Sequence, residues 1–131
     1  MLTYVGRGYS PAFVDNYDRV VTRLSEREPI RLVDGPDDIC APIEYAEGAH
    51  CHNESVVERD RLALAAVRDL LGATVDLNRE FSLDTAMLAR FRSAFSTGQT
   101  RAGCNGCEWS GLCDHVAGTG YVGTTLQVPP G

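Results

Sequence analysis

The residues best suited to chemistry are three cysteines near the end of the chain, Cys104, Cys107 and Cys113. A Cys-x-x-Cys turn lets two thiolates point into one concavity, and Gly103 and Gly106 permit the tight backbone that such a turn requires. If the five residues before Cys113 turn helically, its sulfur returns toward the same point. Three thiolates then converge, and a fourth ligand has to come from elsewhere in the chain.

Cys40 and Cys51 are the candidates for this fourth ligand, because each lies beside turn residues and neither is on an apolar helix face. Sulfur-rich tetrahedral sites bind zinc or iron–sulfur clusters. Structural zinc usually has two compact ligand pairs, whereas one trio with separate single cysteines suits a cluster better. We therefore expect an iron–sulfur cluster of the four-iron (4Fe-4S) type, with zinc as the alternative cofactor. Trp109 and Leu112 would give the centre an apolar wall.

Buried free thiols are a plainer interpretation of these cysteines, because such thiols pack like small hydrophobic side chains. This interpretation suits Cys40 alone. It fits Cys104, Cys107 and Cys113 poorly, since they lie in a polar, glycine-rich stretch with little apolar surface to join.

A thiol enzyme is a third hypothesis, with Cys51 as the nucleophile and His50 or His52 as its base. Adjacent side chains in an extended loop point to opposite sides, so at most one histidine shares the face of Cys51. No substrate follows from this pattern and no other catalytic constellation is present in the sequence. Whether the protein is an enzyme is therefore left open.

The number of cysteines also bears on the compartment. Five cysteines in 131 residues is an odd and modest number, so a complete disulfide framework would leave one thiol over. The first eight residues lack the apolar and basic regions of a signal peptide. We expect a reducing, cytoplasmic compartment, where clustered cysteines more often bind metal or catalyse reactions than form disulfides.

Length, composition and charge exclude several classes of protein. A chain of 131 residues with 44% hydrophobic and 23% charged residues predicts a single soluble domain over residues 1–131. No apolar run approaches the roughly 20 residues that span a bilayer, so we expect no membrane partner. The net charge of −6 argues against a nucleic-acid partner. All 12 basic residues are arginine, which excludes a Walker phosphate loop and Schiff-base chemistry. The expected partner is an unidentified redox or other protein.

Three helices must position the cysteines. Ser10 and Pro11 begin a helix predicted over about residues 11–26. A second helix begins at Asn53 or Ser55 and ends at Gly72. Within it, Leu62-Ala63-Leu64-Ala65-Ala66 is apolar nearly all round, which predicts a central position. A third helix begins at Ser82 and ends near Gly98.

The remaining segments predict short strands and loops. Ile30–Val33 and Thr74–Leu77 are the candidate strands, residues after about 100 show little periodicity, and residues 124–131 are expected to be a flexible tail. The predicted fold is α+β and helix-dominated, with about three main helices, a few short strands and an irregular Cys-rich C-terminal region. The aromatic residues Tyr4, Tyr9, Phe13 and Tyr17 are expected to pack in the core.

A series of motifs runs through the chain in a recognisable order. They are Gly6-x-Gly8-Tyr9-Ser10, Asp37-Asp38-Ile39-Cys40, Cys51, Arg59-Asp60-Arg61, Cys104-x-x-Cys107-x-Trp109 and Cys113. This order resembles the short bacterial and archaeal proteins grouped as domain of unknown function 1284, over essentially the whole chain. The resemblance implies iron–sulfur binding and does not specify a biochemical role.

Two departures from that family bear on the ligand set. Members typically open with Arg-Pro-His-His-x-Leu-Cys directly before the residues that match Leu2-Thr3-Tyr4, whereas this sequence starts at Met1. We therefore expect an N-terminal truncation that removes one cysteine and two histidines. Some members carry Cys-x-x-Cys where this chain has Cys40-Ala41-Pro42-Ile43, so the second cysteine of that pair is Ile43 here.

Overall fold

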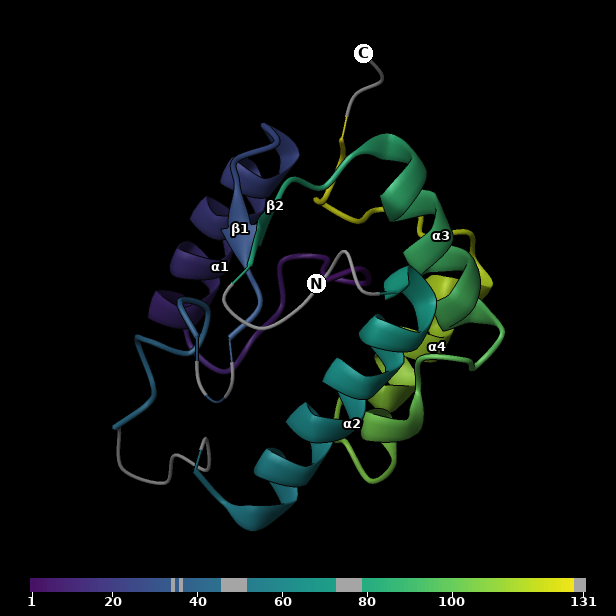
Figure 1. The fold of residues 1–131 in the computed structure, drawn as a ribbon. Helices are drawn as coiled ribbons and strands as arrows, with labels where there is room; N and C mark the ends of the chain where they lie inside the picture. Colours follow the sequence, from purple (N-terminus) through teal and green to yellow (C-terminus); the bar gives the residue numbers. More distant parts are fainter. Residues whose placement is uncertain (34, 36, 46–51, 73–78, 129–131) are drawn as a thin grey trace.

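Helices dominate the computed structural model, which describes residues 1–33, 35, 37–45, 52–72 and 79–128 (Figure 1). The elements in chain order are α1 (Pro11–Ser25), β1 (Ile30–Arg31), α2 (Glu54–Leu71), β2 (Glu80–Phe81), α3 (Thr85–Ser96), the short 3-10 helix η2 (Ala102–Cys104) and α4 (Ser110–Gly118). The predicted helix-dominated α+β class is confirmed. The Cys-rich region is more regular than the sequence indicates, because it contains η2 and α4. Among the described helices, none combines the length and apolarity needed to cross a membrane.

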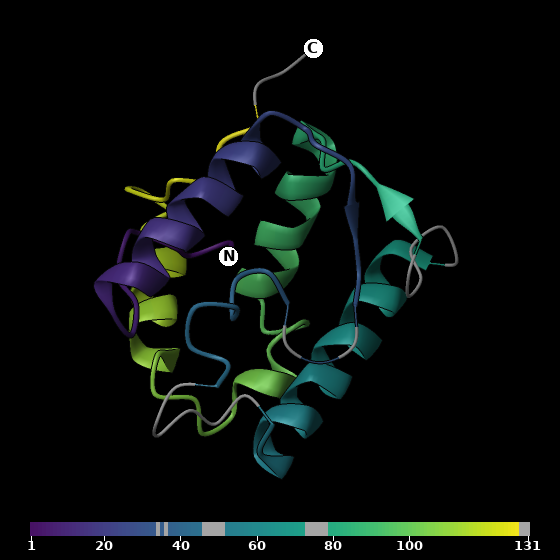
Figure 2. The ribbon, with the colours of Figure 1, turned by 90° about the vertical axis from the view of Figure 1, so that its left-hand side faces the viewer.

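The elements surround the amino-terminal segment. In Figure 1, α1 and the two strands lie on one side of the molecule, and α2, α3 and α4 lie on the other. Figure 2, turned by 90°, also places the amino terminus in the middle of the fold. The first residues of the chain therefore lie between helices that come from opposite halves of the sequence.

The start of α1 follows the sequence prediction closely. Ser10 is the N-cap, and its hydroxyl oxygen accepts a hydrogen bond from the backbone N–H of Phe13 at 3.1 Å. Pro11 occupies the first helical position, where its missing N–H costs no helical hydrogen bond. Phe13, Val21 and Leu24 then form the buried face of the helix.

The prediction that α2 sits centrally is wrong. No residue of α2 is buried, and Ala63 and Ala65 are exposed. Leu62, Leu64 and Val67 are half-buried, so only one side of the helix packs on the protein. The apolar run reflects alanines that favour helix formation at solvated positions, not a helix surrounded by core. Its predicted boundaries are confirmed, since Asn53 is the N-cap and Gly72 the C-cap.

The strands and α3 differ in detail from the prediction. β1 pairs antiparallel with β2, with Ile30 opposite Phe81. The predicted strand at 74–77 lies outside the described residues. α3 is capped by Asp84, whose carboxylate accepts from the Met87 N–H at 2.7 Å, and not by Ser82.

The core closes with the C-terminal segment, and the predicted flexible tail is wrong for residues 124–128. Thr124, Leu126 and Val128 are buried, and Leu126 is 0% exposed. Arg92 of α3 donates to the Thr124 hydroxyl oxygen at 3.0 Å and to the Leu126 carbonyl oxygen at 2.9 Å. The segment packs in one cluster with residues from the other end of the chain, Tyr4 among them. Residues 129–131 lie outside the described part.

Candidate functional site

The three C-terminal cysteines lie on one short stretch of turns. Cys104 ends η2, and the backbone N–H of Cys107 donates to the Cys104 carbonyl oxygen at 3.0 Å. Cys113 is in α4, where its N–H donates to the Trp109 carbonyl oxygen at 3.0 Å. The helical return of the chain toward Cys113, which the spacing predicts, is therefore present. All three side chains are half-buried.

Glycine holds this stretch against α2. A Cβ at Gly103 would lie only 2.7 Å from the carbonyl oxygen of Arg59, so only glycine allows the two backbones to approach this closely. Gly106 has φ +78°, the left-handed region that favours glycine, and the Arg59 guanidinium lies beside it. α2 therefore acts as the support of the cysteine segment.

Cys113 faces the interior of the molecule. Its sulfur and the hydroxyl of Thr3 share a hydrogen bond of 3.1 Å, which joins the two ends of the chain. Burial lowers the pKa of the Met1 amino group, and the nearby Cys113, Asp37 and Cys104 side chains oppose that shift. Cys104 and Cys113 are thus both neighbours of the central amino terminus.

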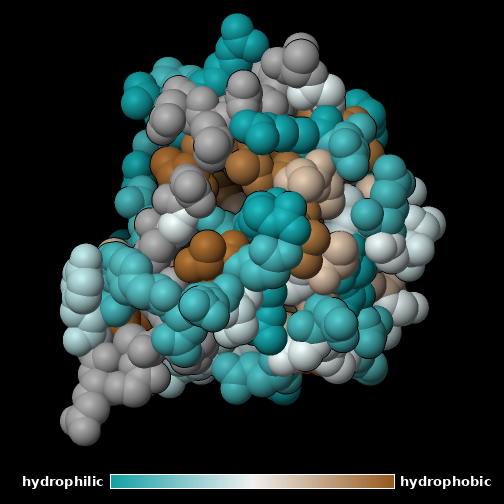
Figure 3. Space-filling view, turned by 60° about the horizontal axis from the view of Figure 1, so that its bottom comes forward, coloured by the Kyte–Doolittle hydropathy of each residue, from teal (hydrophilic) through white to brown (hydrophobic). Residues whose placement is uncertain are grey.

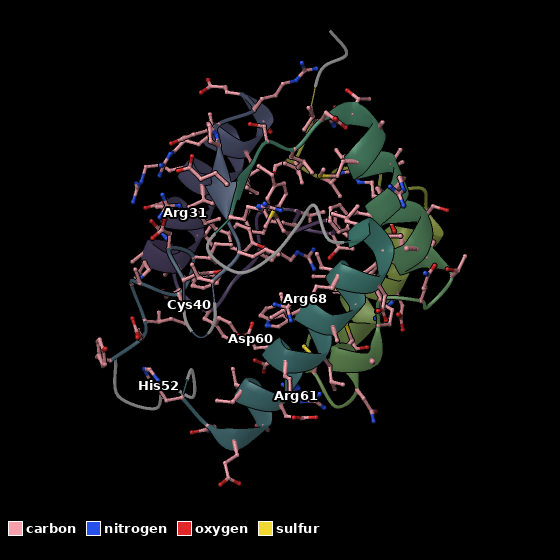
Figure 4. All side chains as sticks on the ribbon, in the orientation of Figure 1. Arg31, Cys40, His52, Asp60, Arg61 and Arg68 are labelled. Carbon is pink, nitrogen blue, oxygen red and sulfur yellow. The ribbon has the colours of Figure 1, made fainter. Side chains whose placement is uncertain are left out.

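Cys40 approaches the same region from another direction. It lies on the loop after β1, its N–H donates to the Asp37 carbonyl oxygen at 3.0 Å, and its side chain is half-buried (Figure 4). Burial raises the pKa of Tyr17, and the neighbouring Cys113 and Cys40 side chains add to this rise. Cys40 and Cys113, 73 residues apart in sequence, therefore both lie close enough to Tyr17 to affect its ionisation.

Cys107 acts on Tyr9, a different group from those that Cys104 and Cys113 affect. Burial is the main cause of the raised pKa of Tyr9, and the nearby Cys107 side chain adds to the rise. Trp109, predicted to be an apolar wall, packs its half-buried ring edge-to-face on Tyr9 at 5.5 Å. Within the described ranges, no three His, Cys, Asp or Glu side chains are grouped closely enough to hold a metal ion. Cys51 lies outside the described residues, so its predicted ligand role is not tested.

Two neighbours of the cysteines were not predicted from the sequence. One is Thr3, described above. The other is Arg101, which forms an ion pair with Asp114 at 2.7 Å, lies over the ring of Phe95 at 4.2 Å and lies close enough to Cys104 for the thiol to influence its pKa. Its position directly before the cysteine segment is the only sequence signal, because its partners come from α3 and α4. Arg101 places a fixed positive charge beside the Cys104 sulfur.

A cavity of about 790 Å³ leads toward this region from the side of α2. Its walls come from α1, β1 and α2, with Leu24, Ile30 and Leu64 among the lining residues, and Met1 and Ile39 also line it. Figure 3 shows hydrophobic side chains gathered around a hollow on one face of the molecule. The cavity gives small molecules an approach to the neighbourhood of Cys40 and the amino terminus.

The histidine part of the thiol-enzyme hypothesis finds no support in the described residues. His50 and Cys51 lie outside them. His52 is exposed, hydrogen-bonds the carboxylate of Glu44 at 3.1 Å and stacks near Tyr45 (Figure 4). The imidazole of His52 is therefore engaged by Glu44 and Tyr45 on the surface.

Comparison with known families assigns the chain. Residues 8–113 match the family described as Protein of unknown function (DUF1284), so the chain belongs to that family. The match begins just before α1 and ends at Cys113, and it therefore includes the four cysteines that the structure describes. Searches of curated proteins and of solved structures gave no match.

Proposed function

We propose that this protein holds a thiolate-bound metal centre, namely a four-iron iron–sulfur cluster. Its ligands would be Cys104, Cys107 and Cys113, completed by Cys51 or Cys40. When bound, such a cluster accepts and donates single electrons, and it also serves as a structural staple. A reducing, cytoplasmic compartment and a redox or other protein partner belong to the same proposal.

The observation that carries this proposal is the shared surroundings of cysteines from distant segments. Cys104 and Cys113 are neighbours of the Met1 amino group, and Cys113 and Cys40 are neighbours of Tyr17. None of the four described cysteines forms a disulfide. Half-buried cysteines from distant segments that form no disulfides are candidates for metal ligands.

The described residues supply this ligand set only in part. Three sulfurs are not grouped in the described part of the chain. Binding therefore requires the turn at 104–107 to reorient and, if Cys40 is not the fourth ligand, Cys51 to close the site. Gly106, within this turn, lowers the steric cost of such a reorientation.

Residues around the sulfurs would tune the centre. The hydroxyl of Thr3 can donate to the Cys113 sulfur, and the Arg101 guanidinium lies near Cys104. Hydrogen bonds and positive charge at ligand sulfurs raise the reduction potential of a cluster, because they stabilise the more negative reduced state.

A structural zinc site is the second candidate, because the same thiolates bind zinc. It would make the protein an interaction module without a redox role. The two candidates differ in metal content, since zinc binding requires neither iron nor sulfide.

Single Cys→Ser variants, each purified without oxygen, test the proposal. We expect Cys104→Ser, Cys107→Ser and Cys113→Ser to lose most of the bound iron. Exactly one of Cys40→Ser and Cys51→Ser should also lose it, which identifies the fourth ligand. Asn105→Ser is the matched control, because Asn105 is exposed within the same turn and should keep its iron. Retention of iron by all three C-terminal variants would refute the proposed ligand set.

A further inference from the structure

Two tyrosines stack face to face in the interior beside the cysteines. The rings of Tyr4 and Tyr17 are 1° from parallel, and their centroids are 3.8 Å apart. Tyr4 is 6% exposed and Tyr17 is half-buried. When one of two stacked rings loses an electron, the positive charge is shared with the other ring, so the pair is easier to oxidise than a single phenol.

The hydroxyl of Tyr4 has a proton acceptor in place. It donates to the Asp18 carboxylate at 2.7 Å, a short charge-assisted hydrogen bond. The Val14 carbonyl oxygen lies farther away, at 3.3 Å. A phenol must lose its proton when it is oxidised, and a base within this distance can take it in the same step. Asp18 is exposed, which gives the proton a route to solvent.

Further rings connect this pair to the surface. Tyr17 contacts Phe13 at 5.7 Å, Phe13 contacts Tyr9 at 5.3 Å, and Tyr9 contacts Trp109 at 5.5 Å, all edge-to-face. Tyr9 is 46% exposed. Tyr9 and Trp109 are oxidisable, and Phe13 bridges the gap between Tyr9 and Tyr17. An electron can therefore pass from the buried pair to an acceptor at the surface. Phe13 is the one ring on this route that is not readily oxidised.

We infer that Tyr4, stacked on Tyr17 and hydrogen-bonded to Asp18, is a one-electron redox site of this protein. Its co-reactant is an outer-sphere one-electron oxidant that meets the chain at Tyr9 and Trp109. The oxidant gains one electron, the O–H bond of Tyr4 breaks, and its proton bonds to the Asp18 carboxylate. The products are a neutral Tyr4 phenoxyl radical, a protonated Asp18 and the reduced co-reactant. An electron from a reductant and the proton from Asp18 reverse the step.

Two features distinguish this arrangement from aromatic packing alone. Packing accounts for the rings of Tyr4 and Tyr17 but would be satisfied equally by phenylalanine. It does not require a carboxylate at the Tyr4 hydroxyl. Tyr9 also lies beside a carboxylate, Glu108, but its exposure leaves a radical there open to quenching. The buried pair is where the radical should persist. The inference does not depend on a metal centre.

Photo-oxidation of the full chain tests the inference. Ruthenium(III) tris-bipyridine, generated by a light flash in the presence of persulfate, serves as the oxidant, and the tyrosyl radical is followed by its optical absorption and electron paramagnetic resonance. The wild-type chain should give a long-lived radical whose formation slows in deuterium oxide. Tyr4→Phe should abolish the long-lived fraction. Asp18→Asn should slow its formation by about a hundredfold, the size of a general-base effect.

The control is Tyr45→Phe, which removes a phenol that is 84% exposed and outside the ring chain. It should leave the lifetime and the rate unchanged. Circular dichroism of each variant confirms that it is folded. Tyr17→Phe is a second test: it removes the Tyr17 hydroxyl but keeps the stacked ring, so the long-lived Tyr4 radical should remain. An unchanged radical lifetime in folded Tyr4→Phe overturns the inference. So does an unchanged rate in folded Asp18→Asn.

Discussion

At the scale of single residues, burial controls the ionisation of the interior tyrosines. Desolvation is the largest cause of the raised pKa of both Tyr4 and Tyr17, and the Asp18 hydrogen bond adds to the rise at Tyr4. Of the aromatic residues predicted to be in the core, Tyr4 and Phe13 are buried, whereas Tyr9 is 46% exposed. Tyr9 contacts Trp109, which is 100 positions away in the sequence, so local patterning does not reveal this contact.

The raised pKa values of these tyrosines predict that the protein loses stability in alkali. An unfolded tyrosine ionises near pH 10, while the folded Tyr17 holds its proton to higher pH. The stabilising contribution is therefore complete below about pH 10 and is lost as the pH rises through the folded pKa. The free energy of unfolding, measured by urea denaturation, should fall as the pH rises above about 10.

Tyr17→Phe keeps the ring and removes the titrating hydroxyl. The variant should lose free energy of unfolding less steeply than the wild-type chain over the same alkaline range. Equal slopes for the two proteins would contradict the assignment of the pH dependence to Tyr17.

At the scale of elements, α2 is a peripheral support rather than a core helix. The sequence predicts its boundaries well, because Asn53 and Gly72 are local signals. Its position could not be predicted, because the same alanines that favour helix formation occur on buried and solvated faces alike. The close approach of η2 at Gly103 defines which part of α2 carries the cysteine segment.

Gly103→Ala tests that approach. The new Cβ would lie 2.7 Å from the Arg59 carbonyl oxygen, so the backbones must separate, and we expect a loss of about 1–3 kcal/mol in the free energy of unfolding. The control is Gly111→Ala in α4, where the new Cβ would meet no neighbouring atom within 4 Å. Because alanine favours a helix over glycine, we expect the free energy of unfolding to rise by about 0.5–1 kcal/mol. Thermal or urea unfolding measures both. Equal stability of the two variants would contradict the proposed close contact.

At the scale of the whole molecule, the two ends of the chain meet in the interior. Thr3 contacts Cys113, Tyr4 and Leu126 share the hydrophobic core, and the Thr125 N–H donates to the Tyr4 carbonyl oxygen at 3.1 Å. The alternation of buried Thr124, Leu126 and Val128 with exposed neighbours is a period-two pattern. That signal was present in the sequence, but a short segment near a chain end resembles a tail until its partners are known.

Leu126→Ala measures how much this segment contributes. Because Leu126 is 0% exposed, the truncation leaves a cavity, and the free energy of unfolding should fall by about 2–5 kcal/mol. Val122→Ala, four residues earlier at a side chain that is 75% exposed, should change it by no more than about 0.5 kcal/mol. A loss at Leu126 as small as that at Val122 would show that the C-terminal segment does not complete the core.

The candidate site shows the same division between local and distant information. The turn at Cys104–Cys107 and the helix that carries Cys113 follow from spacing and glycines, and both are present, whereas the predicted convergence of the three sulfurs is not found among the described residues. Whether Cys40 acts on the same groups as Cys113 depends on how α1, its following loop and α4 pack, so the sequence could only offer Cys40 as a candidate. Family membership is confirmed over residues 8–113 and does not itself specify an activity.

The most direct test of the central claim is the amount of iron, acid-labile sulfide and zinc per chain in protein purified without oxygen. We expect about four iron and four sulfide per chain, the content of one four-iron cluster, and negligible zinc. Stoichiometric zinc without sulfide would select the structural zinc module instead. Protein without iron or zinc, even after anaerobic reconstitution with iron and sulfide, would show that the cysteines hold no metal centre.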